Sequence, residues 1–504
     1  MTGTAATDDH ARHGTTQSGL KRGLSSRHLQ MIALGGAIGT GLFNGSGQTI
    51  SVAGPSIILV YAIIGFFVFF LMRAMGEMLL SNLAYKSFRD IAEDKLGVWA
   101  GFFSGWTYWL CWIANGLADT AAMTNYVLWW FPQCPKFLPG LVLVALLFIL
   151  NVIAVRIFGE VEFWFALIKI AAIGALILVA GGMILTGFHS DLSTLIGQRS
   201  DDAVVVQTLT QAYPGGVDAS LGNLLNTEGG GVFPNGLRGF IGGFQIAFFA
   251  FTGVELAGTA AAETENPRKS LPKAINSIPL RVGLFYIVAL AAILSVTPYL
   301  AVDPSVSPFV NMFGLTGLGF AASVVNFVVL TAAASSMNSG IYSASRMMFG
   351  LSLSRLAPKA FSILSRSGVP IRALIFSCLF ILPGIGLLYA SSSVMGAFMY
   401  AASASNVLFM FVWILIVVSY LAYRRATPAL HAASNYKMPG GVVMSVIVLM
   451  FFAAMLVVLC LNQQTLIGVL ATLVWFVALG IAYGARLMAR RNRSGASRRA
   501  TPRD

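Results

Sequence analysis

Apolar segments long enough to cross a lipid bilayer follow one another along almost the whole chain. The core of a bilayer is about 30 Å thick, so a helix needs about 20 apolar residues to span it. Only 10% of the 504 residues are charged, whereas soluble domains have about a quarter. The expected fold is therefore an all-α membrane protein with one membrane domain, residues 28–489, between an N-terminal tail, 1–27, and a basic C-terminal tail, 490–504. We expect twelve spans, near residues 29–46, 54–80, 97–130, 141–156, 161–186, 236–262, 274–298, 316–347, 370–389, 395–424, 440–461 and 465–489.

Basic residues are distributed unequally between the two sides of this bundle. The formal net charge of +13 could indicate nucleic-acid binding in a soluble protein. If the N-terminus is cytoplasmic, however, only Lys136, Arg199 and Arg238 of the 32 lysines and arginines fall on the outer side. Because cytoplasmic loops of membrane proteins are enriched in these residues, both termini are predicted to be cytoplasmic. The basic C-terminal tail then suits anionic membrane lipids rather than nucleic acid.

Two expected spans are interrupted by glycine at similar places. The first contains Gly-Gly-Ala-Ile-Gly-Thr-Gly at 35–41, and the sixth contains Gly239, Gly242 and Gly243 before Phe-Ala-Phe-Thr-Gly at 249–253. These spans lie five helices apart. Interrupted helices at corresponding places in two halves are typical of transporters built from inverted repeats. Close helix packing through small residues is the alternative interpretation.

The histidines exclude several kinds of membrane enzyme. All five lie outside the expected spans, at His10, His13, His28, His189 and His431. A metal site or a Ser-His pair within the membrane is therefore not expected, and a carboxylate or lysine must carry any coupled proton. A channel would need a charged ring or a repeated carbonyl filter, which the sequence lacks. We expect no cofactor other than a coupling proton.

Five short stretches resemble a known family. They are LSSRHLQ at 24–30, AGPS at 53–56, RAMGE at 73–77, GEVEFWF at 159–165 and ETENPRKSLPK at 263–273. Together with the Gly-rich first span, they resemble the bacterial amino acid permeases of the amino acid–polyamine–organocation superfamily. The resemblance extends over nearly the whole chain. Further stretches at 72–77, 80–83, 274–279 and 436–439 are similar to permeases for D-serine, D-alanine and glycine.

The resemblance implies a specific fold and activity. The fold would be a 5+5 inverted-repeat core with broken helices 1 and 6, plus two extra C-terminal helices. The protein would import small neutral amino acids (glycine, D-alanine, D-serine) by proton symport across the cytoplasmic (inner) membrane of a bacterium. No nucleic acid or obligate protein partner is implied. A permease for an aromatic amino acid, proline or 4-aminobutyrate remains an alternative, as does an amino acid sensor that does not transport.

The broken helices are the expected substrate site. An amino acid brings a carboxylate and an ammonium group into a low-dielectric site, where an unpaired charge costs several kcal/mol. Free N–H groups at the start of a half-helix suit the carboxylate, and free carbonyls at the opposing break suit the ammonium group. By resemblance, the carboxylate would lie at Ile38, Gly39, Thr40 and Gly41, and the ammonium group near the carbonyls of Phe249, Ala250 and Phe251, with Gly253 beside them.

Ionisable residues within the spans are the candidates for proton coupling. Lys169 lies about 12 Å into the fifth span at 1.5 Å per residue, where it either reaches the inner surface or acts in coupling, as the resemblance implies. Glu255 follows the sixth-span break at similar depth. Asp119, late in the third span, resembles an acidic position of the family's third helix, and a carboxylate at the interface with headgroup water is the alternative. Arg73 and Glu77 have the i,i+4 spacing of a structural ion pair.

The eighth span has a polar face that includes Ser335, Ser336 and Asn338. These side chains could line a polar cavity, and hydrogen bonds that hold neighbouring helices together are the alternative.

Overall fold

The computed structural model describes residues 31, 38–153, 155–197, 199, 202–260, 266–315 and 319–499. The N-terminal tail 1–27, the stretch at 24–30, and Gly35, Gly36 and Ala37 of the first interrupted span lie outside the described residues. The same is true of the first part of the stretch at 263–273 and of residues 500–504 at the end of the C-terminal tail.

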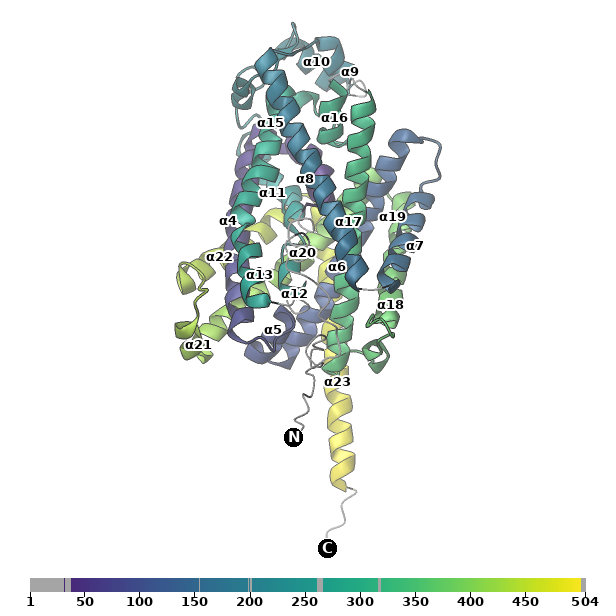
Figure 1. Cartoon of the computed structure of the whole chain (residues 1–504), viewed down its shortest axis with the longest axis vertical. Helices are drawn as coiled ribbons and strands as arrows, with labels where there is room; N and C mark the ends of the chain where they lie inside the picture. The colour runs from purple at the N-terminus through teal and green to yellow at the C-terminus, as the bar shows by residue number, and fades with distance from the viewer. Residues whose placement is uncertain are drawn as a thin grey trace, which may run out of the picture.

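The described chain is a bundle of long helices (Figure 1). The first half contains α2 (Thr40–Phe43), α3 (Gly45–Ala53), α4 (Ile57–Ser81), α5 (Phe88–Leu96), α6 (Val98–Trp130), α7 (Phe137–Ile153) and α8 (Val155–Thr186). The sixth and seventh spans consist of α11 (Gly236–Ala247), the 3-10 turn η3 (Phe248–Phe251), α12 (Leu256–Ala260), α13 (Pro267–Asn276), α14 (Ile278–Arg281), the π-helix η5 (Val282–Val288) and α15 (Ala289–Val296). After α16 (Pro308–Leu315) follow α17 (Gly319–Leu353), α18 (Ile371–Ile381), α19 (Pro383–Ala390), α20 (Val394–Ala426), α21 (Pro428–Ala433), α22 (Gly441–Cys460) and α23 (Gln463–Arg499).

Each expected span corresponds to helical structure, so the prediction of an all-α membrane protein is confirmed. Nine helices within the described residues are long and apolar enough to cross a membrane. α6 is long enough but is not among these nine, because its tryptophans and polar residues lower its hydropathy. It packs against α17 and α20 in the centre of the bundle, where polar groups can bond to each other rather than face lipid.

The expected end of the first span at residue 46 is wrong. The helix continues to Ala53, and Gly54, with φ +59°, separates it from α4. Gly45, Ser46 and Gly47 within this stretch are buried. Gly45 lies against Ile246 of α11, and Gly47 lies against the backbone of Asp303 and Val306, so this burial overrides the weak helix propensity of glycine.

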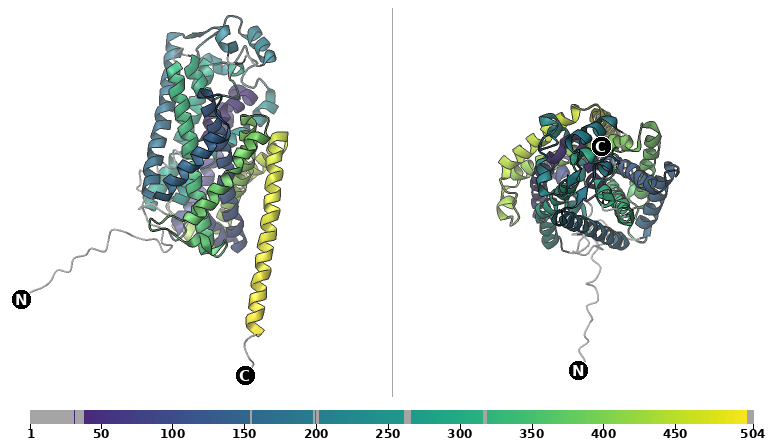
Figure 2. Two further views of the ribbon diagram at one scale, coloured as in Figure 1. Left: turned by 90° about the vertical axis from the view of Figure 1, so that its right-hand side faces the viewer. Right: turned by 90° about the horizontal axis from the view of Figure 1, so that it is seen from above.

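The two ends of the bundle differ. The connection between α8 and α11 forms a cap at one end, with α9 (Leu192–Gly197), α10 (Ala203–Ala212) and a two-stranded antiparallel pair, β1 (His189–Ser190) with β2 (Val217–Asp218). We call this the α10 end, and the opposite end, where α5 and α21 lie, the α5 end (Figure 1). Figure 2 shows α23 along one flank of the bundle, continuing past the α5 end as one helix to Arg499.

Candidate functional site

The breaks in the two interrupted spans contact each other. α2 begins at Thr40, directly after the non-helical Gly39, and packs against η3, where α11 ends. A Cβ atom on Gly41 would lie 2.5 Å from the Ala250 Cα and 2.7 Å from the Phe249 carbonyl carbon. Gly41 therefore allows two backbones to approach, and the space beside it is filled by η3 rather than open to a ligand.

Backbone groups at these breaks have the polarity that an amino acid needs. The N–H groups of Leu42 and Phe43 donate to the Gly39 carbonyl at 3.3 and 3.4 Å. N–H groups at the start of a helix suit a carboxylate, which would have to share these two groups or use the N–H groups that precede Leu42. At the second break, the Phe249 carbonyl accepts from Thr252 Oγ1 at 2.8 Å. The Ala250 carbonyl accepts from Tyr286 OH at 2.8 Å, so an ammonium group would have to share these oxygens.

Gly253 and Gly39 have different roles in the backbone. Gly253 has φ +92°, in the left-handed region that favours glycine, and it lies in the turn between η3 and α12. Gly39 has an extended backbone, and its Cβ would lie 3.3 Å from Ser336 Oγ. A small addition at Gly39 therefore meets a single side chain, which can move.

Asp119 lies at the centre of a buried polar network that joins both breaks. Thr40 Oγ1 donates to Asp119 Oδ1 at 2.7 Å, and Asn115 Nδ2 donates to Asp119 Oδ2 at 2.8 Å. The Asn115 amide also donates to Ser336 Oγ at 3.1 Å and accepts from Thr252 Oγ1 at 3.4 Å. Asp119 is completely buried, so the structure does not place it at the interface with headgroup water. Its network links α2, α6, α17 and the second break.

Lys169 contacts the first break directly. The helix that carries it begins at Val155, so Lys169 is fourteen residues, about 21 Å, from that start at 1.5 Å per residue. Its side chain is completely buried. Lys169 Nζ donates to the Ile38 carbonyl at 2.9 Å and to Ser335 Oγ at 2.9 Å. The lysine therefore bonds to the backbone at the beginning of the broken segment.

Glu255 lies in the second break and bonds to neutral donors. Tyr108 OH donates to Glu255 Oε1 at 3.1 Å, and Trp413 Nε1 donates to Glu255 Oε2 at 3.3 Å. The carboxylate is completely buried. Its partners come from α6 and α20, so the second break is tied to the two central helices.

Sequence reasoning missed Glu162 as a candidate. It is completely buried and accepts hydrogen bonds from Ser335 Oγ and from Asn338 Nδ2, the latter at 3.4 Å. Ser335 and Asn338, expected to line a cavity, instead bond to this carboxylate, and Asn338 Oδ1 also accepts from Asn151 Nδ2 at 2.7 Å. A usable signal was present, because Glu162 and Lys169 are seven residues apart and therefore share a helix face. The glutamate lay at an expected span boundary, where a carboxylate needs no explanation.

The expected ion pair between Arg73 and Glu77 is wrong, because each side chain bonds to the segment before α22. Arg73 Nη2 donates to the Lys437 carbonyl, Arg73 Nη1 donates to Asn276 Oδ1 of α13 at 2.9 Å, and the guanidinium lies 3.8 Å from the Tyr436 ring centroid. Glu77 accepts from Met438 N at 2.7 Å, as well as from Tyr420 and His431. These residues attach a connecting segment to α4.

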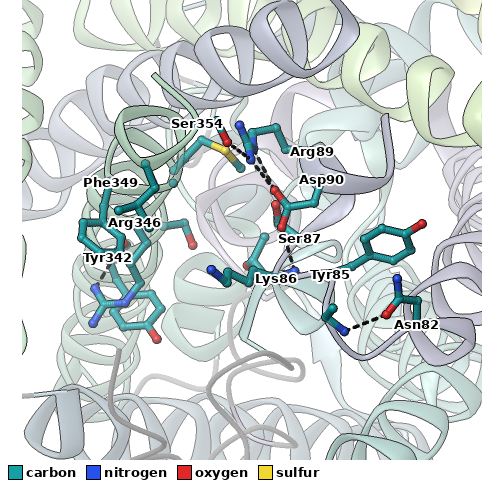
Figure 3. Close-up of a pocket in the computed structure, with 16 residues that line it drawn as sticks. Asn82, Tyr85, Lys86, Ser87, Arg89, Asp90, Tyr342, Arg346, Phe349 and Ser354 are labelled. Atoms are coloured by element: carbon teal, nitrogen blue, oxygen red, sulfur yellow. Dashed lines mark hydrogen bonds and ion pairs between the residues drawn. The ribbon is translucent and has the colours of Figure 1, made fainter. Parts of the chain in front are cut away.

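A cavity of about 320 Å³ lies at the α5 end of the bundle (Figure 3). It is lined by residues of α5 and α17, among them Arg89, Asp90, Tyr342 and Arg346, and by Thr259 of α12. Thr259 follows Glu255 by four residues, which is about one helical turn. The cavity therefore lies next to the central polar groups, on the side of the α5 end.

Comparison with known proteins identifies the family of this chain. A family model described as amino acid permease matches residues 28–493. The D-serine/D-alanine/glycine transporter of Escherichia coli (strain K12) is 52% identical over 476 residues, which cover 94% of this chain and 95% of that protein.

Two further relatives extend the comparison. The amino-acid permease AapA of Bacillus subtilis (strain 168) is 45% identical over 93% of this chain and 95% of its own length. The serine permease SerP1 of Lactococcus lactis is 38% identical over 92% of this chain and 96% of its own length. Identity at this level over nearly complete chains means that the chain belongs to the amino acid permease family, and it is a multi-pass membrane transporter rather than an enzyme.

Proposed function

We propose that this protein imports glycine, D-alanine and D-serine together with protons. The observation that carries the substrate proposal is the 52% identity, over nearly the whole chain, to a transporter named for these three amino acids. The contact between the two broken helices supports it, because the N–H groups of α2 and the carbonyls of η3 are suited to the two charged ends of an amino acid.

Proton coupling is supported by the ionisable groups at the breaks. Lys169 bonds to the Ile38 carbonyl, and Glu255 is part of the second break. A proton bound or released at either group would change the charge beside a broken helix. One charge crossing the membrane contributes about 2.3 kcal/mol per 100 mV, and a tenfold gradient costs about 1.4 kcal/mol. One proton could therefore sustain roughly 40-fold accumulation per 100 mV.

The positions of basic residues support one orientation of the bundle in the membrane. We place the α5 end in the cytoplasm, since Lys86 just before α5, Arg89 and Lys95 of α5 and Lys273 of α13 lie near that end. A membrane-impermeant maleimide added to intact cells should label Cys134, which is partly exposed between α6 and α7 at the opposite end. Labelling only after permeabilisation would contradict this orientation.

L-Serine transport is the second candidate, because the serine permease of Lactococcus lactis matches 92% of this chain. The two proposals differ in the enantiomer that they favour.

The test is a competition experiment in proteoliposomes. Uptake of radiolabelled glycine would be measured with an imposed pH gradient, in the presence of D- and L-alanine, D- and L-serine, proline or phenylalanine. We expect D-alanine and D-serine to compete best. Stronger competition by L-serine would favour the second candidate, and stronger competition by phenylalanine or proline would contradict both. Binding without accumulation would identify a sensor.

A further inference from the structure

We propose that Glu162 is the proton-exchanging partner of Lys169, joined to it through the Ser335 hydroxyl, and that this relay controls how Lys169 holds the broken first helix. The inference rests on the proposed proton-coupled transport and deepens it, because it names a group outside the two breaks that takes part in coupling.

The hydrogen bonds of the relay have a definite direction. Lys169 Nζ donates to Ser335 Oγ at 2.9 Å, and Ser335 Oγ in turn donates to Glu162 Oε1. A hydroxyl has a single proton to donate, and an ammonium group cannot accept, so Ser335 donates to the carboxylate and accepts from Lys169. Both hydrogen bonds therefore run in the same direction, from Lys169 through Ser335 to Glu162.

A proton can move along this chain without any other reactant. One ammonium proton of Lys169 passes to Ser335 Oγ as the hydroxyl proton passes to Glu162 Oε1. One N–H bond and one O–H bond break, and two O–H bonds form. The ammonium and carboxylate groups become a neutral amine and a neutral carboxylic acid. The net charge of the site stays the same, while the positive charge beside the Ile38 carbonyl is lost.

The second oxygen of Glu162 is held by neutral groups from two helices. Asn151 Nδ2 of α7 donates to Asn338 Oδ1 at 2.7 Å. This bond orients the Asn338 amide so that its Nδ2 faces Glu162 Oε2, at 3.4 Å. The carboxyl group is therefore fixed from both sides and lies in position for Ser335.

Few other ionisable groups face this pair among the described residues. Glu162 and Asp119 are carboxylates close to Lys169, and α8 itself also contains Arg156 and Glu160. α8 packs against α7, α15, α17 and η5. α7 and α15 contain no ionisable residue, η5 contributes Tyr286, bonded to the Ala250 carbonyl, and α17 contributes Tyr342 and Arg346.

Glu162 also lies next to the cavity at the α5 end. Phe158, one turn before Glu162 on α8, stacks on Tyr342 with ring centroids 3.9 Å apart. The Arg346 guanidinium lies 3.4 Å from the Tyr342 ring centroid, and both residues line the cavity (Figure 3). The Phe158–Tyr342 stack therefore lies between this cavity and the carboxyl group. Movement of that stack would give Glu162, rather than Lys169, the shorter route to a proton from the α5 side.

The experiment compares gradient-driven accumulation with substrate exchange in proteoliposomes containing the full-length protein. Radiolabelled glycine and serine serve as substrates, and accumulation is followed as a function of internal and external pH. The variants are Glu162→Gln, Glu162→Asp, Ser335→Ala, Lys169→Met and the double variant Glu162→Gln/Lys169→Met. Ser403→Ala is the matched control, because Ser403 is a buried serine that bonds only to Met399 of its own helix. Elution as a single species in size exclusion verifies that each variant is folded.

We expect Glu162→Gln to lower accumulation at least about tenfold and flatten its pH dependence, while exchange stays within about twofold of wild type. Ser335→Ala should act in the same direction, and the double variant should lose no more than Lys169→Met alone, since the two groups act as a unit. Glu162→Asp should partly restore the pH dependence.

Two results would overturn the relay. One is wild-type accumulation and pH dependence in Glu162→Gln, and the other is an equal loss of exchange and accumulation, which would indicate a structural role. If the wild-type protein itself accumulates neither amino acid in response to a proton gradient, the proposed function is wrong and the relay is overturned with it.

Discussion

The two breaks hold their ionisable residues in opposite ways. At the first break, Lys169 bonds to a backbone carbonyl and, through Ser335, to the carboxylate of Glu162. At the second break, Glu255 accepts from the neutral donors Tyr108 and Trp413, and no basic side chain of the described residues forms an ion pair with it. Both sites exclude solvent. The first can hold separated charges that balance each other, whereas an ionised carboxylate at the second has only neutral donors.

This difference indicates that the ionisable residues at the two breaks have different functions. A buried ion pair is destabilised strongly when one partner is removed, because the other charge is left uncompensated. Loss of Lys169 should therefore disturb the geometry of the first break as well as its charge. Loss of the Glu255 charge leaves no unpaired ion, so its effect should be confined to proton handling.

The largest effect is expected from substitutions that push the two breaks apart. Gly41→Ala should reduce uptake at least about 100-fold, because a Cβ atom 2.5 Å from the Ala250 backbone cannot be accommodated by moving a side chain. Gly39→Ala should retain a measurable fraction of uptake, because its Cβ meets only Ser336 Oγ at 3.3 Å. Glycine uptake at matched membrane expression is the measurement. Equal activity of the two variants would show that the breaks do not depend on close contact.

The next effect concerns the charge at the first break. Lys169→Met removes the ammonium group but keeps most of the apolar stem, and it leaves Glu162 without its cation. We expect accumulation to fall at least about tenfold while exchange survives better. Lys95→Met is the control, because this lysine lies on α5 outside the polar network and pairs with Asp94. Wild-type dependence on pH and membrane potential in Lys169→Met would mean that the lysine has no part in coupling.

A smaller effect is expected at the second break. Glu255→Gln keeps the shape of the side chain: the amide oxygen can accept from Trp413 Nε1, and the amide NH2 group can donate to the Tyr108 hydroxyl, which is also an acceptor. Substrate binding should stay within about threefold of wild type, while the pH dependence of uptake weakens. Trp413→Phe, which removes one donor, tests whether positioning matters. If Glu255→Gln collapses exchange as completely as Gly41→Ala, the proposed division of work between the breaks is wrong.

A third buried carboxylate provides a structural contrast. Glu77 accepts from Met438 N, Tyr420 and His431, and so attaches the segment before α22 to α4. Glu77→Gln should lower the free energy of unfolding by about 1–3 kcal/mol, because hydrogen bonds to a buried charge are weakened. The pH dependence of uptake should be unaltered. A changed pH profile would add Glu77 to the coupling groups.

The smallest effect is expected in the cap at the α10 end. A hydrogen bond to Asp218 raises the pKa of His189 above its usual value of 6.5. Because the folded pKa is the higher one, the stabilisation is fully present below about pH 6.5 and is lost as the pH rises through the folded value. Protection factors for hydrogen exchange in the β1–β2 pair, which are corrected for the intrinsic pH dependence of amide exchange, should therefore fall at high pH in wild type and stay constant over this range in His189→Ala. Uptake should keep its pH profile, which separates the cap from both breaks.

The sequence alone determined the membrane class, the number and approximate place of the spans, and the position of both breaks. These features follow from local composition, because a bilayer requires long apolar helices and glycines interrupt them at 35–41 and 249–253. The lone Lys169 and Glu255 within apolar spans were equally visible, since a charge at that depth is costly wherever the helix packs.

Only the tertiary structure decided which groups meet. Gly41 lies against Ala250 across more than 200 residues of chain, and Ser335 joins Lys169 to Glu162 from a different helix. Arg73 and Glu77 have ideal spacing for each other, yet each finds better partners near residue 437. Helix rotation and packing determine such contacts, and local periodicity contains no information about which face of a distant helix will lie opposite.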